Sequence, residues 1–182
     1  MPKNIASKQD WLNLGLKLLN EKGRTALVVE KMSKALGVSK TSFYWHFKTR
    51  NAFLIELAEH WVKQGTQHYI DSANKYETDR EKLFHLTQKV FTKGHSLNSI
   101  RYWREIAQEN ETISEIVTNV ELQRIAYIQS LLTSEFDSEK SYHRADILYH
   151  YFLGWSERHQ GCKIDKDKFQ DLWVNVIEPV IK

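Results

Sequence analysis

The sequence predicts an all-α protein, and three observations support that prediction. The 182-residue chain has only seven glycines and two prolines, fewer chain-breaking residues than a turn-rich β-sandwich or barrel needs. Apolar residues recur at helical spacing along most of the chain, and no segment alternates apolar and polar residues as a half-buried strand does. Polar residues with helix-capping spacing precede several of these segments. A hydrophobic content of 41% is sufficient for a packed core.

The first predicted helix begins with the capping-box spacing of Ser7 and Asp10. Its apolar residues then lie on one face, and Gly23 is expected to end it. Gly15 interrupts that face at a cost of about 1 kcal/mol relative to alanine, which indicates close packing against a neighbouring helix.

Two short helices follow, joined by a tight turn at Gly37. The first is expected from residue 28 or 29 to residue 36, and the second from residue 40 to about residue 46. Gly37 supplies the left-handed backbone that the turn requires, and Ser39 is placed to cap the second helix. This is the spacing of a helix-turn-helix, whose second helix presents its side chains to the DNA major groove.

The rest of the chain is predicted to continue as helices. A fourth helix is expected to begin after Thr49 and to reach about Tyr76. Two further helices are expected to begin at the capping-box spacings Thr78–Glu81 and Thr112–Glu115, with a short apolar segment around Trp103 between them. The next helix is expected to run from Ser138 or Ser141 to about Gln160, where Gly161 ends it. The last helix is expected from about Asp165 to Ile181, and Pro179 should disturb its final turn.

The charge is distributed unevenly along the chain. The whole chain has a formal charge of only +3, but residues 1–50 hold ten basic and three acidic side chains, a net charge of +7. The remaining residues hold 16 basic and 20 acidic side chains, a net charge of −4. The asymmetry favours a head that binds a polyanion and a body with another task. Chance clustering of lysines on a solvated surface is the alternative.

Several classes of protein are excluded by what the sequence lacks. The single cysteine, Cys162, is incompatible with a disulfide framework or a cysteine-based zinc site, and leaves an oxidant-sensing thiol as a minor alternative. No uncharged apolar run reaches 18 residues and no signal peptide is visible, so we expect a cytoplasmic protein without a membrane span. No hydrolase or zinc-protease motif occurs, so we expect neither an enzyme nor a cofactor. His143, Asp146 and His150 share a helix face, which favours a solvated surface over a metal half-site.

The run Gly37–Leu54 resembles the signature of the TetR family of bacterial transcription regulators. The matching residues are Gly37-Val38-Ser39, Phe43-Tyr44, His46-Phe47-Lys48, Arg50 and Leu54. The resemblance implies a three-helix, helix-turn-helix head (residues 1–50) that binds double-stranded DNA, followed by a helical-bundle domain (residues 51–182) for ligand binding and dimerisation. It further implies a ligand-responsive regulator, a repressor that a small-molecule inducer releases from a palindromic operator. An all-α enzyme, or a helical adaptor with a non-functional helix-turn-helix, is the alternative.

The resemblance assigns roles to individual side chains of the head. Tyr44, Lys48 and Arg50 are expected to contact phosphates, and Lys40 and Thr41 are expected to read base edges. Further candidates for DNA binding, each with a structural alternative, are Ser39, Ser42, Trp45 and His46. For Trp45 the alternatives are packing on the sugar-phosphate chain and anchoring of the head to the fourth helix, and we favour the former.

The second helix departs from the family's pattern at its first residues. Many relatives have Ser or Thr there, which caps the helix and touches a phosphate, whereas this chain has Val28 and Val29. Either Thr25 takes over the capping, or this phosphate contact is missing.

The resemblance also places an inducer cavity among the middle helices. Candidate lining residues, each of which can instead be plain core, are Trp61, Gln64, His68, Phe91, His95, Trp103, Arg104, Tyr127, Tyr149 and Phe152. Arg104 is the candidate anchor for an acidic ligand, because an arginine in an apolar helix needs an anionic partner. An internal carboxylate such as Glu105 or Glu109 is the alternative partner.

The last two helices are predicted to pair with their copies in a homodimer. Their apolar residues exceed what one small body needs to cover, namely Tyr151, Phe152, Trp155, Leu172, Trp173 and Val176.

Overall fold

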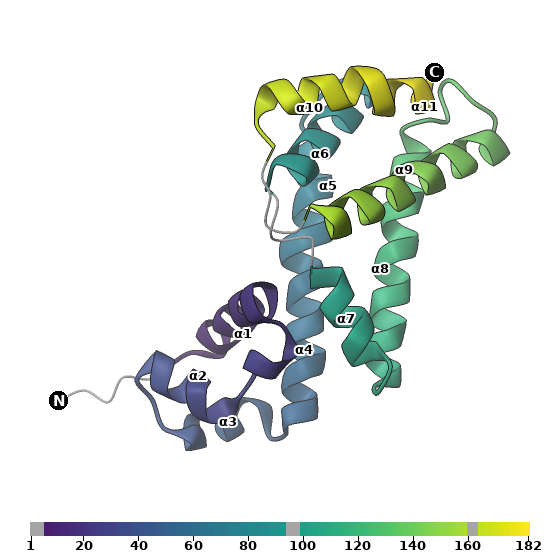
Figure 1. Ribbon diagram of the computed structural model, residues 1–182. Helices are drawn as coiled ribbons and strands as arrows, with labels where there is room; N and C mark the ends of the chain where they lie inside the picture. Colours follow the sequence, from purple (N-terminus) through teal and green to yellow (C-terminus); the bar gives the residue numbers. More distant parts are fainter. Residues whose placement is uncertain (1–5, 94–98, 160–163) are drawn as a thin grey trace. The chain divides into compact units, whose positions relative to one another are not determined.

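The computed structural model describes residues 6–93, 99–159 and 164–182. Within these ranges the chain is helical and contains no strand, so the all-α prediction is confirmed (Figure 1). The chain divides into two compact units, Met1–Lys63 with Ser99–Val117, and Gln64–Asn98 with Thr118–Lys182. The first compact unit therefore extends past residue 50 and takes in a later segment, while the functional division at that residue stays a prediction.

The first unit contains the helix-turn-helix. Its helices are α1 (Lys8–Lys22), α2 (Val29–Leu36), α3 (Lys40–Phe47) and α4 (Arg50–Val62), with a 3-10 turn at Arg24–Ala26 after α1. The capping box is confirmed, since Ser7 Oγ accepts from Asp10 N–H while the Asp10 carboxylate accepts from Ser7 N–H. Gly37 ends α2 in the left-handed conformation, with φ 68°.

Aromatic side chains hold the helices of the head together. Trp11 from α1, Phe43 and Phe47 from α3, and Phe53 from α4 are all buried. The ring centroid of Phe43 lies 5.2 Å from that of Trp11 and 5.1 Å from that of Phe53, in edge-to-face contacts that stabilise a core beyond its area burial. Gly15 allows this packing, because a Cβ atom at its position would lie 2.8 Å from the Phe53 ring.

A later helix, α7 (Ser99–Ala107), belongs to the same unit as the head. The Tyr102 ring covers Gly23, where a Cβ atom would lie 2.9 Å from it, and Trp103 packs on Trp61 with ring centroids 5.5 Å apart. Arg24 forms a two-pronged ion pair with Glu109, just after α7. The head therefore contacts α7 and the residues after it through both apolar and charged side chains.

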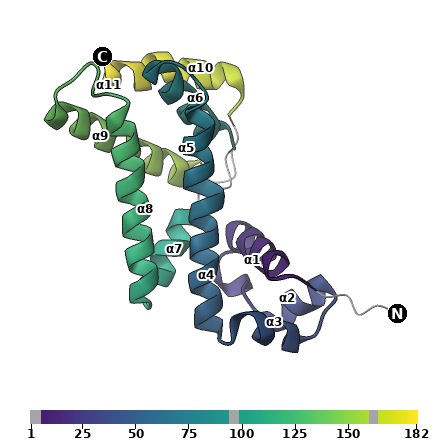
Figure 2. The same cartoon turned by 180° about the vertical axis from the view of Figure 1, so that it is seen from behind.

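The second unit is a bundle of helices around its own core. Its elements are α5 (His68–Ala73), α6 (Asp79–Lys93), most of α8 (Glu111–Ser130), α9 (Ser138–Arg158), α10 (Lys166–Leu172) and α11 (Glu178–Ile181). Helix α10 packs against α6, and α11 packs against α9 (Figure 2). Phe91, Phe152, Phe169 and Trp173 form the centre of this core.

Two helices widen into π-helical turns. The fourth helix continues through a π-helical segment, Lys63–Gln67, into α5, so it ends at Ala73 rather than near Tyr76. A second π-helical segment, Trp173–Ile177, joins α10 to α11 immediately before Pro179. Proline has no N–H to donate within a helix, and its ring clashes with the preceding helical turn, which accounts for the disturbance expected at this position.

Two predicted helix starts are wrong in detail. Helix α8 begins at Glu111, and its cap is Asn110, whose Oδ1 accepts from Ile113 N–H at 3.1 Å, rather than the box that begins at Thr112. Asp137, not a serine, caps α9 by accepting from Lys140 N–H. In both cases the polar residue directly before the helix satisfies its free N–H groups. The predicted stop at Gly161, and Cys162 after it, lie outside the described residues.

Candidate nucleic-acid interface and ligand pocket

Helix α3 presents a polar face that its own aromatic residues hold in place. Phe43 and Phe47 are buried, whereas Tyr44 is 49% exposed and Trp45 is 70% exposed. Lys40 and Thr41 are exposed near the start of the helix, and Lys48 and Arg50 follow it on the surface. Of the remaining candidates, Ser39 is exposed and Ser42 and His46 are half-buried. The structure therefore places the predicted DNA-binding residues on or beside one helix with a fixed core face.

Lys48 adopts an unusual backbone conformation between α3 and α4. Its φ is 61° and its ψ is −50°, and it is the only non-glycine residue with positive φ among the described residues. Thr49 N–H donates to Phe47 O across it at 2.6 Å, which makes Lys48 the central residue of a γ-turn. Strained backbone of this kind is concentrated at functional sites.

Arg50 is the first residue of α4, and its position depends on the cap before it. Thr49 Oγ1 accepts from Ala52 N–H at 3.0 Å, as the sequence predicts for a cap. The exposed Arg50 side chain thus lies at a helix N-terminus, where backbone N–H groups and the helix dipole attract anions.

Lys40 is engaged in an ion pair with α2. Its Nζ lies 3.3 Å from Glu30 Oε2, and Lys34 Nζ lies 3.2 Å from Glu30 Oε1. The two ammonium groups lower the pKa of Glu30, with Lys34 contributing first and Lys40 next. Because all three side chains are exposed, the pairs are weak and do not fix the position of the Lys40 ammonium.

Three alternatives from the sequence are decided by local contacts. His46 Nε2 donates to Ala6 O at 2.9 Å, so this ring holds the segment that leads into α1. The high exposure of Trp45 contradicts its role as an anchor of the head to α4. Val28 precedes α2 without any side-chain cap, and Thr25 lies in the 3-10 turn, so Thr25 does not cap α2.

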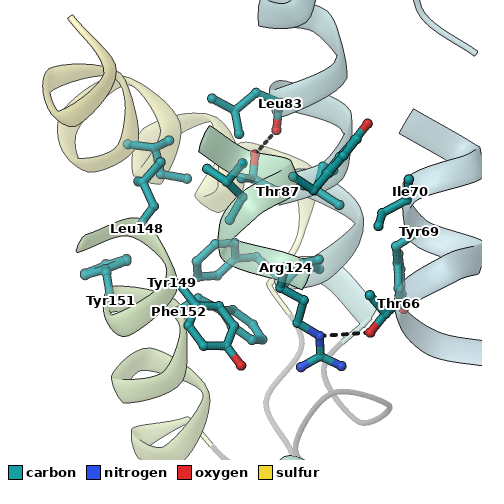
Figure 3. A pocket seen from close by; sticks show the side chains of 16 residues that line it. Thr66, Tyr69, Ile70, Leu83, Thr87, Arg124, Leu148, Tyr149, Tyr151 and Phe152 are labelled. Atoms are coloured by element: carbon teal, nitrogen blue, oxygen red, sulfur yellow. Dashed lines mark hydrogen bonds between the residues drawn. The ribbon is translucent and has the colours of Figure 1, made fainter. Parts of the chain in front are cut away.

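The second unit encloses an apolar pocket between α5, α6, α8 and α9 (Figure 3). Its volume is about 80 Å³. The lining residues are Thr66, Tyr69, Ile70, Leu83, Leu86, Thr87, Val90, Phe91, Arg124, Tyr127, Ile128, Leu148, Tyr149, Tyr151, Phe152 and Ile177.

Arg124 is the charged residue of this lining. Its Nε donates to Thr66 Oγ1 at 2.9 Å, and both terminal nitrogens are buried (Figure 3). Tyr149 lies beside it and donates its hydroxyl to Glu121 Oε1 at 3.1 Å. Burial raises the pKa of Tyr149, and the nearby charge of Arg124 opposes that rise. Burial also raises the pKa of Tyr127, whose hydroxyl donates to Asn74 Oδ1 at 2.7 Å.

The sequence-predicted lining residues divide between the two units. Phe91, Tyr127, Tyr149 and Phe152 lie together at the pocket. The others do not line it: Trp61 and Trp103 pack on each other in the first unit, Arg104 is exposed on α7, Gln64 and His68 are exposed beside the π-helical turn, and His95 lies outside the described residues.

Sequence reasoning missed Arg124. It lies four residues after Val120 and four before Ile128, on the face of α8 that carries the buried Ile113, Val117 and Val120. A charged residue on that apolar face was the available signal.

The apolar residues predicted for the dimer interface mostly pack inside their own chain. Phe152 and Trp173 are buried in the core of the second unit, and Tyr151, Trp155 and Leu172 pack against it. Large apolar side chains that stay exposed on the last helices include Ile147 at 54% and Val174 at 46%. The premise that this apolar surface exceeds what one chain can cover is therefore wrong for most of those residues, because the chain folds its last helices onto its own core.

Neither a metal site nor a membrane span is found in the described part of the chain. No three side chains of the metal-binding types cluster there. His150 Nδ1 lies 3.3 Å from Asp146 Oδ1 and His143 Nε2 lies 3.9 Å from Glu139 Oε1, as pairs along one helix. None of the described helices is long and apolar enough to cross a bilayer.

Comparison with known proteins agrees with the geometry of the head. Residues 12–57 match the family described as "Bacterial regulatory proteins, tetR family". Tetracycline repressor protein class A from transposon 1721 of Escherichia coli is 35% identical over 63 residues, which are 35% of this chain and 29% of that protein. The regulator EthR of Mycobacterium tuberculosis is 25% identical over 123 residues, 66% of this chain and 57% of that protein. The matches thus span less than two thirds of these relatives.

A solved structure extends the likeness to the fold of the remainder. A TetR transcriptional regulator from Legionella pneumophila superimposes with a TM-score of 0.81 over 97% of this chain and 98% of that chain, at 14% identity. Helix-turn-helix geometry and the matched signature agree: residues 12–57 are those of the tetR family of bacterial regulatory proteins, and the whole chain shares the fold of a TetR regulator.

Proposed function

We propose that the protein is a ligand-responsive, DNA-binding transcription regulator, a repressor that a small molecule releases from a palindromic operator. The observation that carries the proposal is the polar face of α3, which projects from a head of net charge +7 over residues 1–50. The proposal keeps the functional division into a DNA-binding part (residues 1–50) and a ligand-binding and dimerisation part (residues 51–182). Such a regulator acts in the cytoplasm.

The dimensions of α3 suit the major groove. Its eight residues span about 12 Å at 1.5 Å per residue, close to the width of about 12 Å of the groove. Tyr44, Lys48 and Arg50 would contact phosphates and set the register, while Lys40 and Thr41 would read base edges.

Dimerisation through the last two helices supports binding to a palindrome. Two recognition helices must lie about 34–36 Å apart, one turn of duplex, which a two-fold dimer provides. On α9, Ile147 is exposed, and a Cβ atom at Gly154, seven residues later on the same face, would meet nothing within 4 Å. That face is therefore open to the close approach of a helix from a second copy.

The pocket of the second unit supports the ligand-responsive part. It is lined by aromatic and aliphatic side chains with few polar groups, as small-molecule sites are. The π-helical turn that carries Thr66 follows α4 directly in the chain, so the pocket wall and the helix after the recognition helix are consecutive parts of one helical segment.

Selection of duplexes from a random library, followed by fluorescence anisotropy of the winners at several salt concentrations, tests the proposal. A near-palindromic consensus and affinity that falls steeply with salt are expected. An adaptor with a non-functional helix-turn-helix, or an enzyme, would enrich no sequence. Its affinity for duplex DNA would be only the weak, sequence-independent attraction expected of a protein with a net charge of +3.

A further inference from the structure

Arg124 brings a positive charge to the pocket of the second unit, but the protein itself balances that charge. Resting on the proposed function, we infer that the effector is an uncharged organic molecule, whose hydrocarbon body fills the pocket and which carries no carboxylate, phosphate or ammonium group. The composition of the lining, the polar side chains that hold Arg124 and the volume of the pocket each support this class of ligand.

The lining provides for a hydrocarbon body. Thirteen of its sixteen residues are aliphatic or aromatic, and the exceptions are Thr66, Thr87 and Arg124. Phe91 and Phe152 meet edge to face in it, with ring centroids 5.5 Å apart. Apolar groups of a ligand gain free energy when they leave water for such surroundings, whereas an ionised group loses its hydration there.

A chain of polar side chains holds Arg124 and ends at a carboxylate. Arg124 Nε donates to Thr66 Oγ1 at 2.9 Å (Figure 3). The Tyr149 hydroxyl donates to Glu121 Oε1 at 3.1 Å and also accepts a hydrogen bond from Arg124. Glu121, a half-buried residue one turn before Arg124 on α8, thus provides the negative charge that balances the guanidinium.

An ionised ligand would disturb this balance. A carboxylate in the pocket would compete with Glu121 and Tyr149 for the guanidinium of Arg124, so that two negative charges would share one positive charge. An ammonium group would lie beside a charge of its own sign. In either case a charge leaves water without a full counter-charge, which costs free energy at a buried site, whereas an uncharged molecule leaves the polar chain intact.

The hydroxyl groups of the lining fit an uncharged ligand too. Thr87 Oγ1 and the Tyr127 hydroxyl each donate to an oxygen of the protein at 2.7 Å. Tyr69 and Tyr151 add two further phenols, and burial raises the pKa of Tyr151, which keeps its hydroxyl neutral. A neutral phenol can hydrogen-bond the oxygen of an alcohol, ether or ketone, but it provides no charge to offset that of an ion.

The volume of the pocket favours a compact ligand. An engineered apolar cavity of about 150 Å³ in another protein stays free of water and binds benzene, and this pocket has a volume of about 80 Å³. Leu86, Val90 and Ile128 line the pocket and are only half-buried, so these side chains can turn aside to admit one ring or a short alkyl chain. Probes of that size are therefore appropriate.

The test compares small molecules that share a skeleton and differ in charge. Hexanol, hexanoate and hexylammonium form one set, and phenylpropanol, phenylpropanoate and phenylpropylammonium form the other. Each is titrated calorimetrically into the full chain at neutral pH. We expect at least one alcohol to bind about tenfold or more tightly than both of its charged partners.

Two variants separate the pocket from the charge balance. Val90→Phe places a ring in the pocket and should weaken alcohol binding about tenfold or more. Its control is Leu122→Phe, which adds a ring at an exposed position of α8 and should leave alcohol binding unchanged. Glu121→Gln keeps the shape of the side chain but leaves the charge of Arg124 unbalanced, so the affinity of hexanoate relative to hexanol should rise about tenfold or more.

Several outcomes overturn the inference. A charged probe that binds at least as tightly as its alcohol in both sets would do so, and so would the absence of binding by all six probes. An unchanged affinity ratio in Glu121→Gln would refute the charge balance, and unchanged alcohol binding in Val90→Phe would refute binding in this pocket. If Val90→Phe does not fold, the wild type and Glu121→Gln decide alone.

DNA binding distinguishes failure of the inference from failure of the proposed function. Tighter binding of the charged probes, with selective DNA binding intact, refutes the uncharged effector but not the regulator. Alcohol binding without any selective DNA binding refutes the regulator instead. Alcohol binding that leaves the affinity for the selected duplex unchanged overturns the inference, because an effector must bind the two states of a regulator with different affinities.

Discussion

Replacing Lys48 by glycine should stabilise the protein and weaken its binding to DNA at the same time. Lys48 is the central residue of the γ-turn between α3 and α4, with φ 61° and ψ −50°. This hand of γ-turn is rare and strained for a residue with a side chain, whereas glycine adopts positive φ without steric cost.

The size of the gain follows from two opposing terms. Strained backbone costs about 1–3 kcal/mol, and glycine loses about 0.5–1 kcal/mol through its greater freedom in the unfolded chain. The exposed Lys48 side chain contributes little packing. The free energy of unfolding should therefore rise by about 1 kcal/mol, which raises the Tm of a chain of this length by about 2–4 °C.

Lys48→Ala separates the two effects, because it removes the charge and keeps the strain. Both variants should bind every duplex more weakly, and each should flatten the slope of log K against log salt by about 0.9 per lost phosphate contact, or about 1.8 per dimer. Calorimetric unfolding and anisotropy titrations measure the two quantities. The reasoning is refuted if Lys48→Gly is no more stable than Lys48→Ala, or if the two variants change sequence preference rather than overall affinity.

Three further changes probe other parts of the molecule. Lys40→Ala should cost about 1–3 kcal/mol per half-site on the selected operator and much less on random duplex, whereas Glu30→Gln, which frees Lys40 from its ion pair, should not weaken the operator complex. The pKa of the buried His60 is lowered, first by burial and then by the charge of Lys63. The unfolded chain therefore binds more protons than the folded chain below about pH 6.5, and the free energy of unfolding should decrease as the pH is lowered through that range. Urea midpoints between pH 5 and 7.5 should show this decrease, and His60→Gln should reduce it. Ile147→Glu should give a monomer by light scattering with nearly unchanged thermal stability, and a persistent dimer would exclude this face of α9 as the interface.

Much of the head could be predicted because its signals are local. The capping box at Ser7, the left-handed Gly37 and the cap at Thr49 each depend on residues within one turn of the chain. The close packing indicated by Gly15 depends on a single neighbouring helix, α4, and the structure identifies Phe53 as the residue that packs there.

The remainder depends on contacts between distant segments. No residue near Arg24 in the sequence indicates that it pairs with Glu109, which lies 85 residues later. The grouping of α7 with the head therefore could not be predicted from the sequence. Arg104 and Arg124 each occupy an apolar-rich helix, and only the packing of α8 against α5 and α9 decides which of them reaches a pocket. The start of α8 was misjudged because Asn110 and Thr112 are both able to cap, and the loop geometry chooses between them.

The π-helical segment Trp173–Ile177 has a consequence for how this chain tolerates changes in length. The helical segment that runs from α10 through these residues to α11 buries four side chains at a constant spacing of four residues, namely Phe169, Trp173, Ile177 and Ile181. Four residues turn a regular α-helix by about 400°, so such a row would drift by about 40° at each step and leave the core. A π-helical turn accommodates one inserted residue and cancels the drift. Deleting the exposed Val174 would therefore produce the ordinary spacing of four, three and four, and the segment should lose this residue while its buried side chains still face the core.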